Sequence, residues 1–341
     1  MEIQSVAIPS VIEGYNLQLE GVTKYELNGL KIKDNDEDYI IGNLALSEGK
    51  NPHKAINSSV NEVDYRLLIK TSLMIASKFV KEPMVVATGF PQATININKK
   101  QAIDYISGLD SVEYDARPYG GKGYKTETFG INKTDIITET AAATRALRDD
   151  PARKNENFFI VSVGYGTVEI GLSTVDGIVK RTEASASGLR YAINLAKDQM
   201  VENHYVGLRT EHQFDQAFQK GKIIINRQRI DLSEIRRNAL QQHYKDVISP
   251  LIRGAWEDED FSTADTIVLV GGGALYPDVV QSFEEEFDGF ATVEVADNPA
   301  YTASIGYCLH AKDIGSGNKS SAVGIDVGNS QTVISFYKEE E

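Results

Sequence analysis

The sequence is poor in the residues that build disulfides, zinc sites and membrane spans. Its 341 residues include one cysteine, Cys308, so neither an intrachain disulfide nor a zinc site made of several cysteines can form. No apolar run approaches the ~18 residues of a membrane-spanning helix. The opening residues, Met1–Gln4, lack the basic and apolar pattern of a secretion signal. We therefore expect a cytoplasmic protein without a membrane partner.

The chain has fewer basic than acidic residues. The chain contains 35 Lys and Arg against 49 Asp and Glu, which gives a formal net charge of −14. A surface of this sign repels phosphate backbones, so we expect no direct binding to nucleic acid. A basic protein partner, or a nucleotide that carries a metal ion, is compatible with the charge.

Several familiar catalytic motifs are also missing. No G-x-x-x-x-G-K-[ST] loop occurs, which excludes a P-loop nucleotide hydrolase. The five histidines show no HExxH-type spacing, and serines such as Ser262 and Ser304 lack a nucleophile-elbow context. A zinc protease and an α/β-hydrolase are therefore not indicated.

The distribution of apolar residues predicts an α/β fold. Hydrophobic residues make up 41% of the chain, an ordinary globular share, and the length favours two domains. Short buried strands alternate with stretches of helical spacing. We expect strands, or strand–turn–strand units, within residues 5–11, 22–48, 84–88, 158–173, 266–270 and 322–337. We expect helices at residues 63–79, 138–148, 188–202, 211–219, 233–256 and 300–311, and one that starts at Pro277.

One stretch lacks a regular pattern, and one shows signals for helix ends. Residues 95–124 show no regular period, and we expect them to be irregular, with a loop at Gly120–Gly123. Gly221 is placed to end the helix before it, and Asp231 with Glu234 resembles a capping box that opens the next helix.

Two strand–turn–strand segments resemble each other, at residues 323–333 and 160–170. Each has an apolar strand, a glycine turn and a β-branched return strand. A tight glycine turn lets backbone N–H groups converge, which suits an anion such as a nucleotide's phosphate tail. Asp326 precedes the first turn, where a carboxylate is placed to hold Mg²⁺. Either segment taken alone is more simply interpreted as an ordinary β-hairpin with glycine in its turn.

A third glycine segment follows a buried strand. Gly271, Gly272 and Gly273 come directly after Thr266–Val270 and before a helix. Such a turn lets a flat ring lie against bare backbone, although it is also a common α/β loop.

Together these segments resemble the actin-like ATPase superfamily, and more narrowly the ParM-like plasmid-segregation actins of bacteria. Residues 323–333 resemble its phosphate-1 motif, 160–170 its phosphate-2 motif and 266–277 its adenosine motif. Residues 137–142 and 298–309 resemble its two connecting helices, and residues 86–91 resemble a strand typical of the ParM-like branch. The resemblance implies an actin-like, ribonuclease-H-like fold with a nucleotide cleft between two domains. Domain I would comprise residues 1–140 and 301–341, including a small subdomain IB, and domain II residues 141–300.

The chain departs from the family pattern in two ways. The phosphate-1 segment usually begins such a chain and here ends it, so we expect a circular permutation in which residues 314–321 join the old termini. The run Gly315-Ser316-Gly317 is typical of an engineered linker and favours an artificial permutation over a natural one. Ser162 stands where the family usually has aspartate, which predicts weaker coupling to Mg²⁺ or slower hydrolysis.

The resemblance also implies roles for individual residues. The ligand would be ATP or ADP with Mg²⁺ at Asp326, and the catalytic set Glu139, Asp326 and Ser162. Glu139 would orient the attacking water, or else be a first-turn acid that the helix dipole favours. Glu169 would face the ribose or the metal's waters, or be a solvated strand residue. The remaining contacts would be phosphate donors, a sugar neighbour at Gly188 and an adenine cradle; the donors are Gly328, Asn329, Ser330, Gln331, Gly164, Tyr165, Gly166 and Thr167, and the cradle is Gly271, Gly272, Gly273 and Ala274.

The function implied is that of an ATPase that polymerises head to tail when it binds ATP and disassembles after hydrolysis. Its cargo would be plasmid DNA, held through a separate DNA-binding adaptor protein. A monomeric sugar or acetate kinase of the same fold is one alternative. A nucleotide-binding structural protein with little hydrolysis is the other, and Ser162 favours it.

Overall fold

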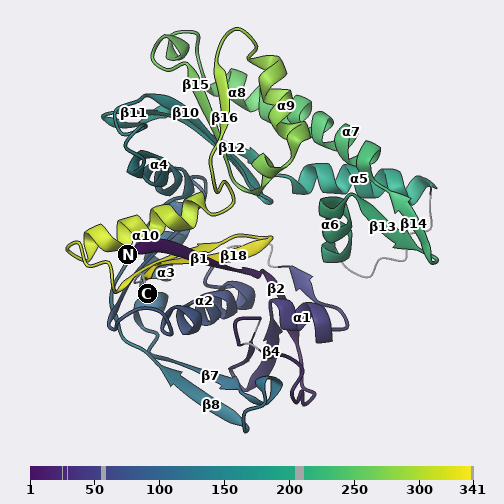
Figure 1. Ribbon diagram of the computed structural model, residues 1–341, viewed down its shortest axis with the longest axis vertical. Helices are drawn as coiled ribbons and strands as arrows, with labels where there is room; N and C mark the ends of the chain where they lie inside the picture. Colours follow the sequence, from purple (N-terminus) through teal and green to yellow (C-terminus); the bar gives the residue numbers. More distant parts are fainter. Residues whose placement is uncertain (25, 29, 55–58, 204–210, 339–341) are drawn as a thin grey trace. The chain divides into compact units, whose positions relative to one another are not determined.

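The computed structural model describes residues 1–341 except 25, 29, 55–58, 204–210 and 339–341 (Figure 1). The chain divides into two compact units. Unit 1 contains residues 1–90, 94–138 and 304–341, and unit 2 contains residues 91–93 and 139–303. None of the helices in the described part of the chain is long and apolar enough to cross a membrane.

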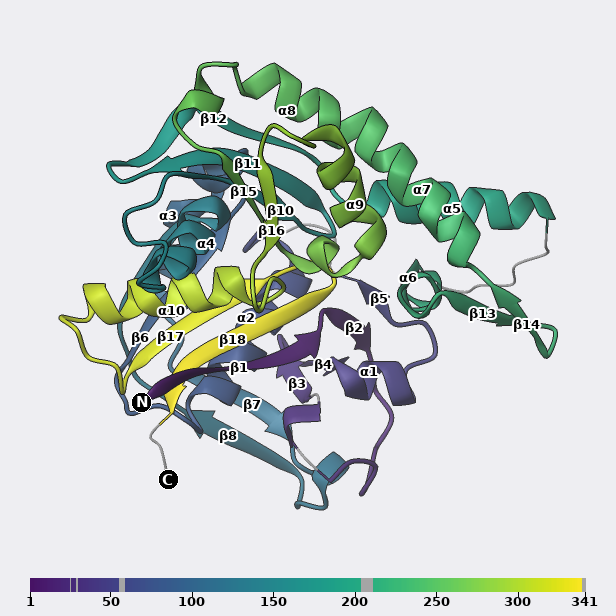
Figure 2. The ribbon, with the colours of Figure 1, turned by 45° about the horizontal axis from the view of Figure 1, so that its top comes forward.

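The main sheet of unit 1 has five strands in the order β1-β18-β17-β6-β9 (Figure 2). β1 pairs antiparallel with β18, and β18 pairs antiparallel with β17, whereas β17, β6 and β9 run parallel. The first strand of the chain therefore lies beside the last. The bounds are β1 (Glu2–Pro9), β6 (Met84–Phe90), β9 (Ile131–Thr138), β17 (Ala322–Val327) and β18 (Gln331–Lys338).

Three long helices accompany this sheet. They are α2 (Val63–Ala76), α3 (Ile95–Ser107) and α10 (Thr302–Ile314). α2 buries a broad apolar stripe that includes Leu68 and Leu73 against the side chains of β17 and β18. α10 packs so closely on β17 that a Cβ at Gly324 would collide with the Ser304 carbonyl and the Cys308 amide. Only glycine fits that contact.

The second sheet of unit 1 is antiparallel, in the order β5-β2-β4-β3-β7-β8. A short helix, α1 (Asn43–Glu48), packs on β2 and β4. The strands are β2 (Val11–Gly14), β3 (Lys31–Asp34), β4 (Glu37–Ile41), β5 (His53–Lys54), β7 (Ser111–Asp115) and β8 (Tyr124–Thr128).

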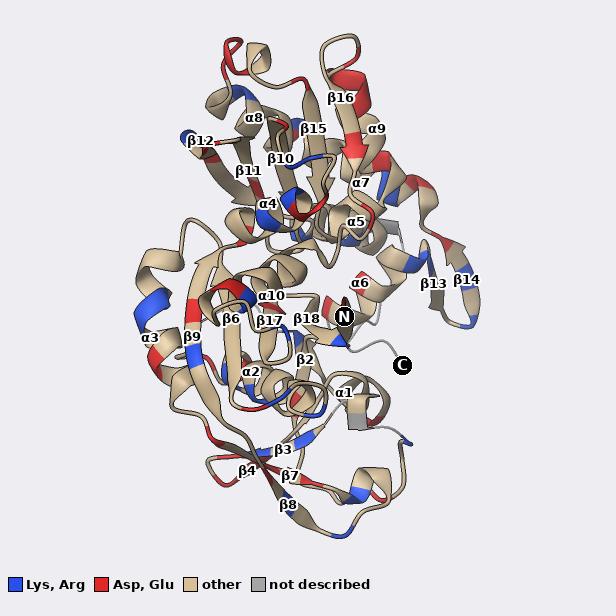
Figure 3. Ribbon diagram, turned by 60° about the vertical axis from the view of Figure 1, so that its left-hand side comes forward, with Lys and Arg blue, Asp and Glu red and all other residues tan. Residues whose placement is uncertain are grey.

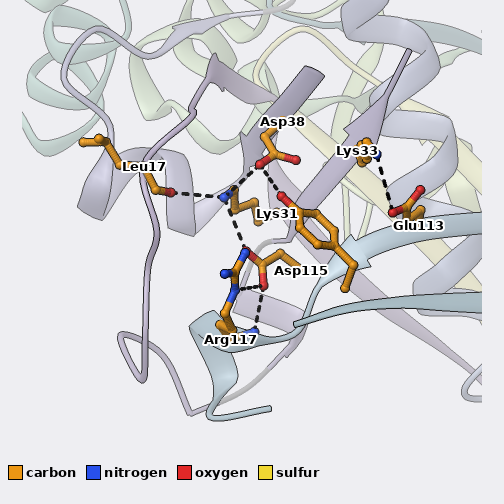
Figure 4. Close-up of polar contacts among 8 residues, drawn as sticks. Leu17, Lys31, Lys33, Asp38, Glu113, Asp115 and Arg117 are labelled. Atoms are coloured by element: carbon orange, nitrogen blue, oxygen red, sulfur yellow. Dashed lines mark hydrogen bonds and ion pairs between the residues drawn. The ribbon is translucent and has the colours of Figure 1, made fainter. Parts of the chain in front are cut away.

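A charged network crosses the middle of this second sheet (Figure 4). The Lys31 ammonium lies 3.0 Å from an Asp38 carboxylate oxygen and 3.3 Å from Asp115, and donates to the Leu17 carbonyl. Arg117 donates to both carboxylate oxygens of Asp115, at 2.8 and 2.7 Å. The Lys31 and Asp115 side chains are 1% and 0% exposed, so each depends on the other charges for compensation.

Unit 2 is built on a five-stranded sheet in the order β12-β11-β10-β15-β16. β10, β11 and β12 form an antiparallel meander, and β15 and β16 add in parallel beside β10. A separate hairpin pairs β13 with β14. The strands are β10 (Phe158–Val163), β11 (Thr167–Thr174), β12 (Gly177–Ser187), β13 (Lys222–Ile225), β14 (Gln228–Asp231), β15 (Thr266–Val270) and β16 (Thr292–Val295).

The helices of unit 2 bury their apolar sides on this sheet and on one another. α5 and α7 lie side by side, and α7 continues through a π-helical turn, Tyr244–Ile248, into α8 (Figure 2). The bounds are α4 (Glu139–Asp149), α5 (Arg190–Asn203), α6 (Glu211–Lys220), α7 (Ser233–His243), α8 (Ser249–Ala255) and α9 (Pro277–Glu286).

The two main sheets share one strand pattern. In each, a hairpin occupies the centre: β17–β18 in unit 1 and β10–β11 in unit 2. A third antiparallel strand flanks the hairpin on one side, β1 or β12, and two parallel strands follow on the other. The similarity between the two strand–turn–strand segments thus extends to their whole sheets.

Two local expectations were wrong. Residues 95–124 are not irregular: they contain α3, β7 and the first residue of β8. α3 shows little helical periodicity because exposed apolar and buried polar side chains, such as Ile97 and Asn98, interrupt its pattern. The capping box is also absent: α7 begins after Leu232 without a side-chain cap, and the Asp231 carboxylate accepts instead from the Ser233 N–H, at 2.8 Å. Gly221, at φ +66°, does end α6.

Candidate functional site

One serine, Ser10, donates two hydrogen bonds to the turn of the β17–β18 hairpin. Ser10, which is 0% exposed, donates from its hydroxyl to the Gly328 carbonyl at 2.6 Å and from its N–H to the Ser330 carbonyl at 3.1 Å. Its hydroxyl also lies 2.9 Å from the Thr332 hydroxyl. Because two carbonyls of the turn are engaged in this way, its backbone N–H groups are what the main chain can offer to an anion.

Asp326 is two residues before this turn, near the end of β17. Burial raises the pKa of its carboxyl to about 6. A cation beside the group would favour its charged form and offset that burial. Among the described residues no group of three or more His, Cys, Asp and Glu could hold a metal by itself. Mg²⁺ still fits here, because it keeps several water and phosphate ligands beside one carboxylate.

The turn of the β10–β11 hairpin has the same construction in unit 2. The carbonyls of Gly164, Tyr165 and Gly166 accept hydrogen bonds of 2.9–3.0 Å. The donors are the N–H groups at the start of α5, those of residues 188–190. This turn too keeps its carbonyls inside. Its Gly164 N–H donates to the Thr167 carbonyl at 2.9 Å, so an anion would be met by the later N–H groups of the turn.

The Tyr165 side chain is directed away from such a role. Its hydroxyl donates to the Glu211 carboxylate at 2.6 Å, and Arg190 donates to the same carboxylate from its Nε at 2.8 Å. The hydroxyl proton of Tyr165 is therefore engaged, and a phosphate at this turn would meet the backbone of Tyr165.

Two glycine segments pack directly on this turn. A Cβ at Gly188 would lie 2.5–2.7 Å from three backbone atoms of Gly164, Tyr165 and Thr167. Gly271 has φ +82°, and its Cβ would lie 2.6 Å from the Val163 carbonyl oxygen. A Cβ at Gly273 would lie 2.2 Å from Cγ1 of the Val163 side chain. The loop Gly271–Ala274 thus presents bare backbone next to the β10–β11 turn.

Unit 2 therefore brings several predicted site residues together. Ser162 pairs with Glu169 across β10–β11 and with Val270, the residue before Gly271, across β10–β15. Glu139 is the first residue of α4, immediately after β9. Asp326 and residues 328–331 form a second group in unit 1.

Glu169 is buried and hydrogen-bonded, so the interpretation of it as a solvated strand residue was wrong. It is 1% exposed, and its carboxylate accepts from the Gln92 N–H at 2.7 Å and the Thr140 hydroxyl at 3.2 Å. These partners belong to residues 91–93 and to α4, two segments at which the chain enters unit 2. Burial, with a smaller contribution from Glu183, raises the pKa of Glu169 to about 7, although the hydrogen bonds oppose the shift.

This raised pKa predicts a specific pH dependence of stability. Between pH ~4.3 and ~7 the native protein keeps a proton on Glu169 that the unfolded chain has released, so its free energy of unfolding falls as the pH rises. In Glu169→Gln this slope should disappear, while the amide keeps an acceptor for Gln92 and a donor for Thr140. Urea unfolding at pH 5, 6, 7 and 8 should show the variant gaining about 2 kcal/mol on the wild type across the range.

The matched control is Asp176→Asn, in the exposed turn between β11 and β12. Its stability should follow the wild type at every pH. Parallel curves for Glu169→Gln and the wild type would contradict the assignment of the titration to Glu169.

The arginines of residues 227–237 lie on two elements, the β13–β14 hairpin and α7, where Figure 3 marks basic residues in blue. Arg227 and Arg229 are exposed on the β13–β14 hairpin. Arg236 donates to the carbonyls of Phe218 and Gln219 at the end of α6, where its charge complements the helix dipole. Arg237 lies 3.5 Å from Asp278.

Sequence reasoning missed two residues at the unit 1 turn, Ser10 and Lys54. The Lys54 Nζ lies 3.5 Å from the Ser330 hydroxyl oxygen. Both residues lie hundreds of positions from the turn in sequence, and only the pairing of β1 with β18 and of β2 with β5 brings them there. No local pattern could have revealed them.

Comparison with known proteins identifies the fold. Residues 2–141 match the family model described as the N-terminal domain of actin-like proteins. One similar structure is a non-polymerisable quadruple mutant of pCBH ParM, with TM-score 0.72 and 19% identity over 90% of this chain and 92% of that chain. A 15-stranded ParM filament from Clostridium botulinum gives TM-score 0.71 and 17% identity, over 90% and 92%. An archaeal actin homologue in complex with ADP gives 0.67 and 16%, over 90% and 92%.

These likenesses extend over nearly the whole chain and confirm the α/β, actin-like fold expected from the sequence. The protein thus has an actin-like fold similar to that of ParM, and its residues 2–141 match the N-terminal domain of actin-like proteins.

Proposed function

We propose that this protein is an ATPase that binds Mg-ATP between its two units and polymerises into filaments. The observation that carries the proposal is the pair of glycine turns, Gly328–Gln331 and Gly164–Thr167. The two turns occupy the same place in two similar sheets. In each, backbone carbonyls of the turn accept hydrogen bonds from residues outside it, Ser10 in unit 1 and residues 188–190 in unit 2. Similar folds include one in complex with ADP and one from a filament, which supports the proposal.

The units are proposed to be the two domains of an actin-like protein, with the chain circularly permuted. In unit 2 the hairpin β10–β11 leads directly into the flanking strand β12. In unit 1 the corresponding flanking strand, β1, starts the chain, while its hairpin β17–β18 ends it. Joining the end of β18 to the start of β1 would restore the order of unit 2, which supports a permutation.

Each group has a proposed role in the reaction. Bound Mg²⁺ would neutralise phosphate charge, and Asp326 would hold it directly or through water. The N–H edges of the two turns would hold the phosphate oxygens, with Asn329, Ser330, Gln331 and the Thr167 hydroxyl as further donors. Gly271–Ala274 would cradle the base.

The remaining polar groups act on the water and the metal shell. Glu139 would accept a hydrogen bond from the attacking water and thereby orient it. Ser162 would contact the metal's waters without adding charge, which predicts slow turnover. Gly188 would lie near the sugar. Glu169 is proposed to hold Gln92 and Thr140 in position through its hydrogen bonds and not to contact the nucleotide.

The proposal is tested by assembly and hydrolysis in the same sample. With Mg-ATP, light scattering should rise and electron microscopy should show filaments, and the signal should decay as phosphate is released. In Glu139→Gln, filaments should form and persist while phosphate release falls at least ~100-fold, because the variant loses the base that orients water.

The alternatives give other outcomes. Filaments without phosphate release from the wild type would favour a structural protein with little hydrolysis. A monomer that transfers phosphate to a sugar or to acetate would favour a kinase. A wild type that binds no nucleotide would contradict the proposal altogether.

For the cell we propose a cytoplasmic filament that moves plasmid DNA through a separate DNA-binding adaptor. The net charge of −14 supports an adaptor over direct contact with DNA. Copurification of the filament with plasmid only when a basic partner protein is present would support this step.

A further inference from the structure

His243 is a buried ionisable residue that the proposed reaction does not use. It is the last residue of α7, directly before the π-helical turn Tyr244–Ile248, and it is 0% exposed. Its Nε2 lies 2.8 Å from the Ser187 carbonyl oxygen. Because a carbonyl can only accept, Nε2 carries the proton and donates. Irregular π-helical turns of this kind are frequent at functional sites.

The stability of the core does not explain a histidine at this position. Burial lowers the pKa of His243, although the Ser187 carbonyl and Asp246 oppose the shift. Within the part of the chain that the structure describes, its Nδ1 has no hydrogen-bond partner. A leucine would fill about the same space without leaving a polar atom unpaired. What the leucine would lack is the hydrogen bond to Ser187.

The Ser187 carbonyl belongs to the same peptide unit as the Gly188 N–H. In a trans peptide these two groups point in opposite directions. The carbonyl accepts from His243, and the N–H donates to the Gly166 carbonyl at 3.0 Å. The peptide is therefore held from both sides, by α7 on one and by the β10–β11 turn on the other. Hydrogen bonds in such a chain polarise and strengthen one another.

The π-helical turn makes a second contact with the same segment. The hydroxyl of Tyr191, in the first turn of α5, donates to the Asp246 carboxylate at 2.9 Å. The Tyr191 N–H donates to the Gly188 carbonyl at 3.0 Å. Residues 187–191 are thus held by α7 and the π-helical turn, while residues 188–190 hold three carbonyls of the β10–β11 turn. A displacement of this segment would be transmitted to the turn.

We propose that His243 is a positioning residue of the nucleotide site. By holding the peptide between Ser187 and Gly188, it keeps the β10–β11 turn in the shape in which its N–H groups meet phosphate. The inference rests on the proposed nucleotide site and adds a residue that touches no ligand itself. Ser187 is exposed, so water can replace His243 at its carbonyl without fixing the peptide. The loss of this donor should therefore affect phosphate binding more than folding.

Two measurements on the full-length protein test this role. The first is hydrogen exchange of the Gly188 amide by NMR without nucleotide, which His243→Leu should speed at least tenfold. The second is calorimetric affinity: the same variant should bind Mg-ATP about tenfold more weakly, and adenosine, which has no phosphate, less than twofold more weakly. His243→Gln, whose amide can donate from nearly the position of Nε2, should bring both quantities to within threefold of the wild type.

Trp256→Phe is the matched control. The Trp256 Nε1 donates to the Thr182 carbonyl at 3.3 Å, so this variant also removes a buried side-chain donor from β12, but in the middle of the strand. It should lower Tm and leave Gly188 exchange and Mg-ATP affinity unchanged. If His243→Leu failed to fold, His243→Met would give the same comparison, because its flexible side chain fills irregular space.

Each other outcome has a distinct meaning. Unchanged Gly188 exchange in His243→Leu would overturn the inference, and so would faster exchange with unchanged Mg-ATP affinity. A glutamine variant as weak as His243→Leu, or an equal loss of affinity in Trp256→Phe, would show a general effect of packing and would also overturn it. A wild type that binds no nucleotide would refute the proposed function itself, and with it this role. That result is recognised without any variant.

Discussion

Replacing Gly188 by alanine is expected to lower the free energy of unfolding by about 3 kcal/mol and to weaken nucleotide binding at least tenfold. The added Cβ would lie 2.5 Å from the Gly164 carbonyl oxygen, 2.6 Å from the Thr167 nitrogen and 2.7 Å from the Tyr165 carbonyl oxygen. All three are backbone atoms, so no side chain can turn aside to make room. Either the β10–β11 turn or the start of α5 must move.

That movement would break the hydrogen bonds by which residues 188–190 hold the carbonyls of the turn. Their distances are 2.9–3.0 Å, so a shift of half an ångström is enough to weaken them. The freed carbonyls could then rotate toward the edge from which the N–H groups would bind phosphate. Stability and binding should therefore fall together, and urea unfolding and nucleotide titration would measure the two losses.

Gly254→Ala is the matched control for Gly188→Ala. Gly254 lies within α8, in the same unit, and a Cβ there meets nothing within 4 Å. Alanine is the better helix former, so this variant should gain about 0.5–1 kcal/mol and bind nucleotide normally. If Gly188→Ala proved as stable as the wild type, the close packing of α5 on the turn would be wrong.

The sequence could predict the two hairpins because their signals are local. In residues 158–174 and 322–338 an apolar run, a glycine turn and a β-branched run follow one another without interruption. The structure has strands at these places, at Phe158–Val163 and Thr167–Thr174 and again at Ala322–Val327 and Gln331–Lys338. The sequence signals for the buried strand before Gly271 and for the glycine that ends α6 are equally local.

What could not be predicted depends on distant pairing. Ser10 and Lys54 reach the Gly328–Gln331 turn only because β1 lies beside β18 and β2 beside β5. Glu169 lies between two apolar residues of β11, Val168 and Ile170, an alternation that would put its side chain on an exposed face of the strand, yet its carboxylate is buried and accepts from the Gln92 N–H. A single sequence carries no period or spacing that records such contacts.

The second large effect is expected from Asp115→Ala, which should cost about 3–5 kcal/mol of unfolding free energy. Burial alone would raise the pKa of Asp115, but the hydrogen bonds from Arg117 and Lys31 hold it below its ordinary value. Its contribution to stability is therefore fully present at neutral pH and is lost as the pH falls below about 4. Removing the carboxylate leaves the Lys31 ammonium, 1% exposed, with Asp38 as its remaining carboxylate contact among those found in the described residues.

The control and the rescue separate lost charge compensation from lost packing. Asp36→Asn removes the charge of a carboxylate that is 96% exposed and 3.3 Å from Lys33, and it should change stability by less than about 0.5 kcal/mol, because asparagine tolerates the φ of +66° at this position. The double variant Lys31→Met, Asp115→Leu removes both buried charges, and should recover at least half of the loss because apolar side chains pack there without a desolvation cost. A double variant as unstable as Asp115→Ala would show that geometry, and not uncompensated charge, makes this network necessary for the second sheet.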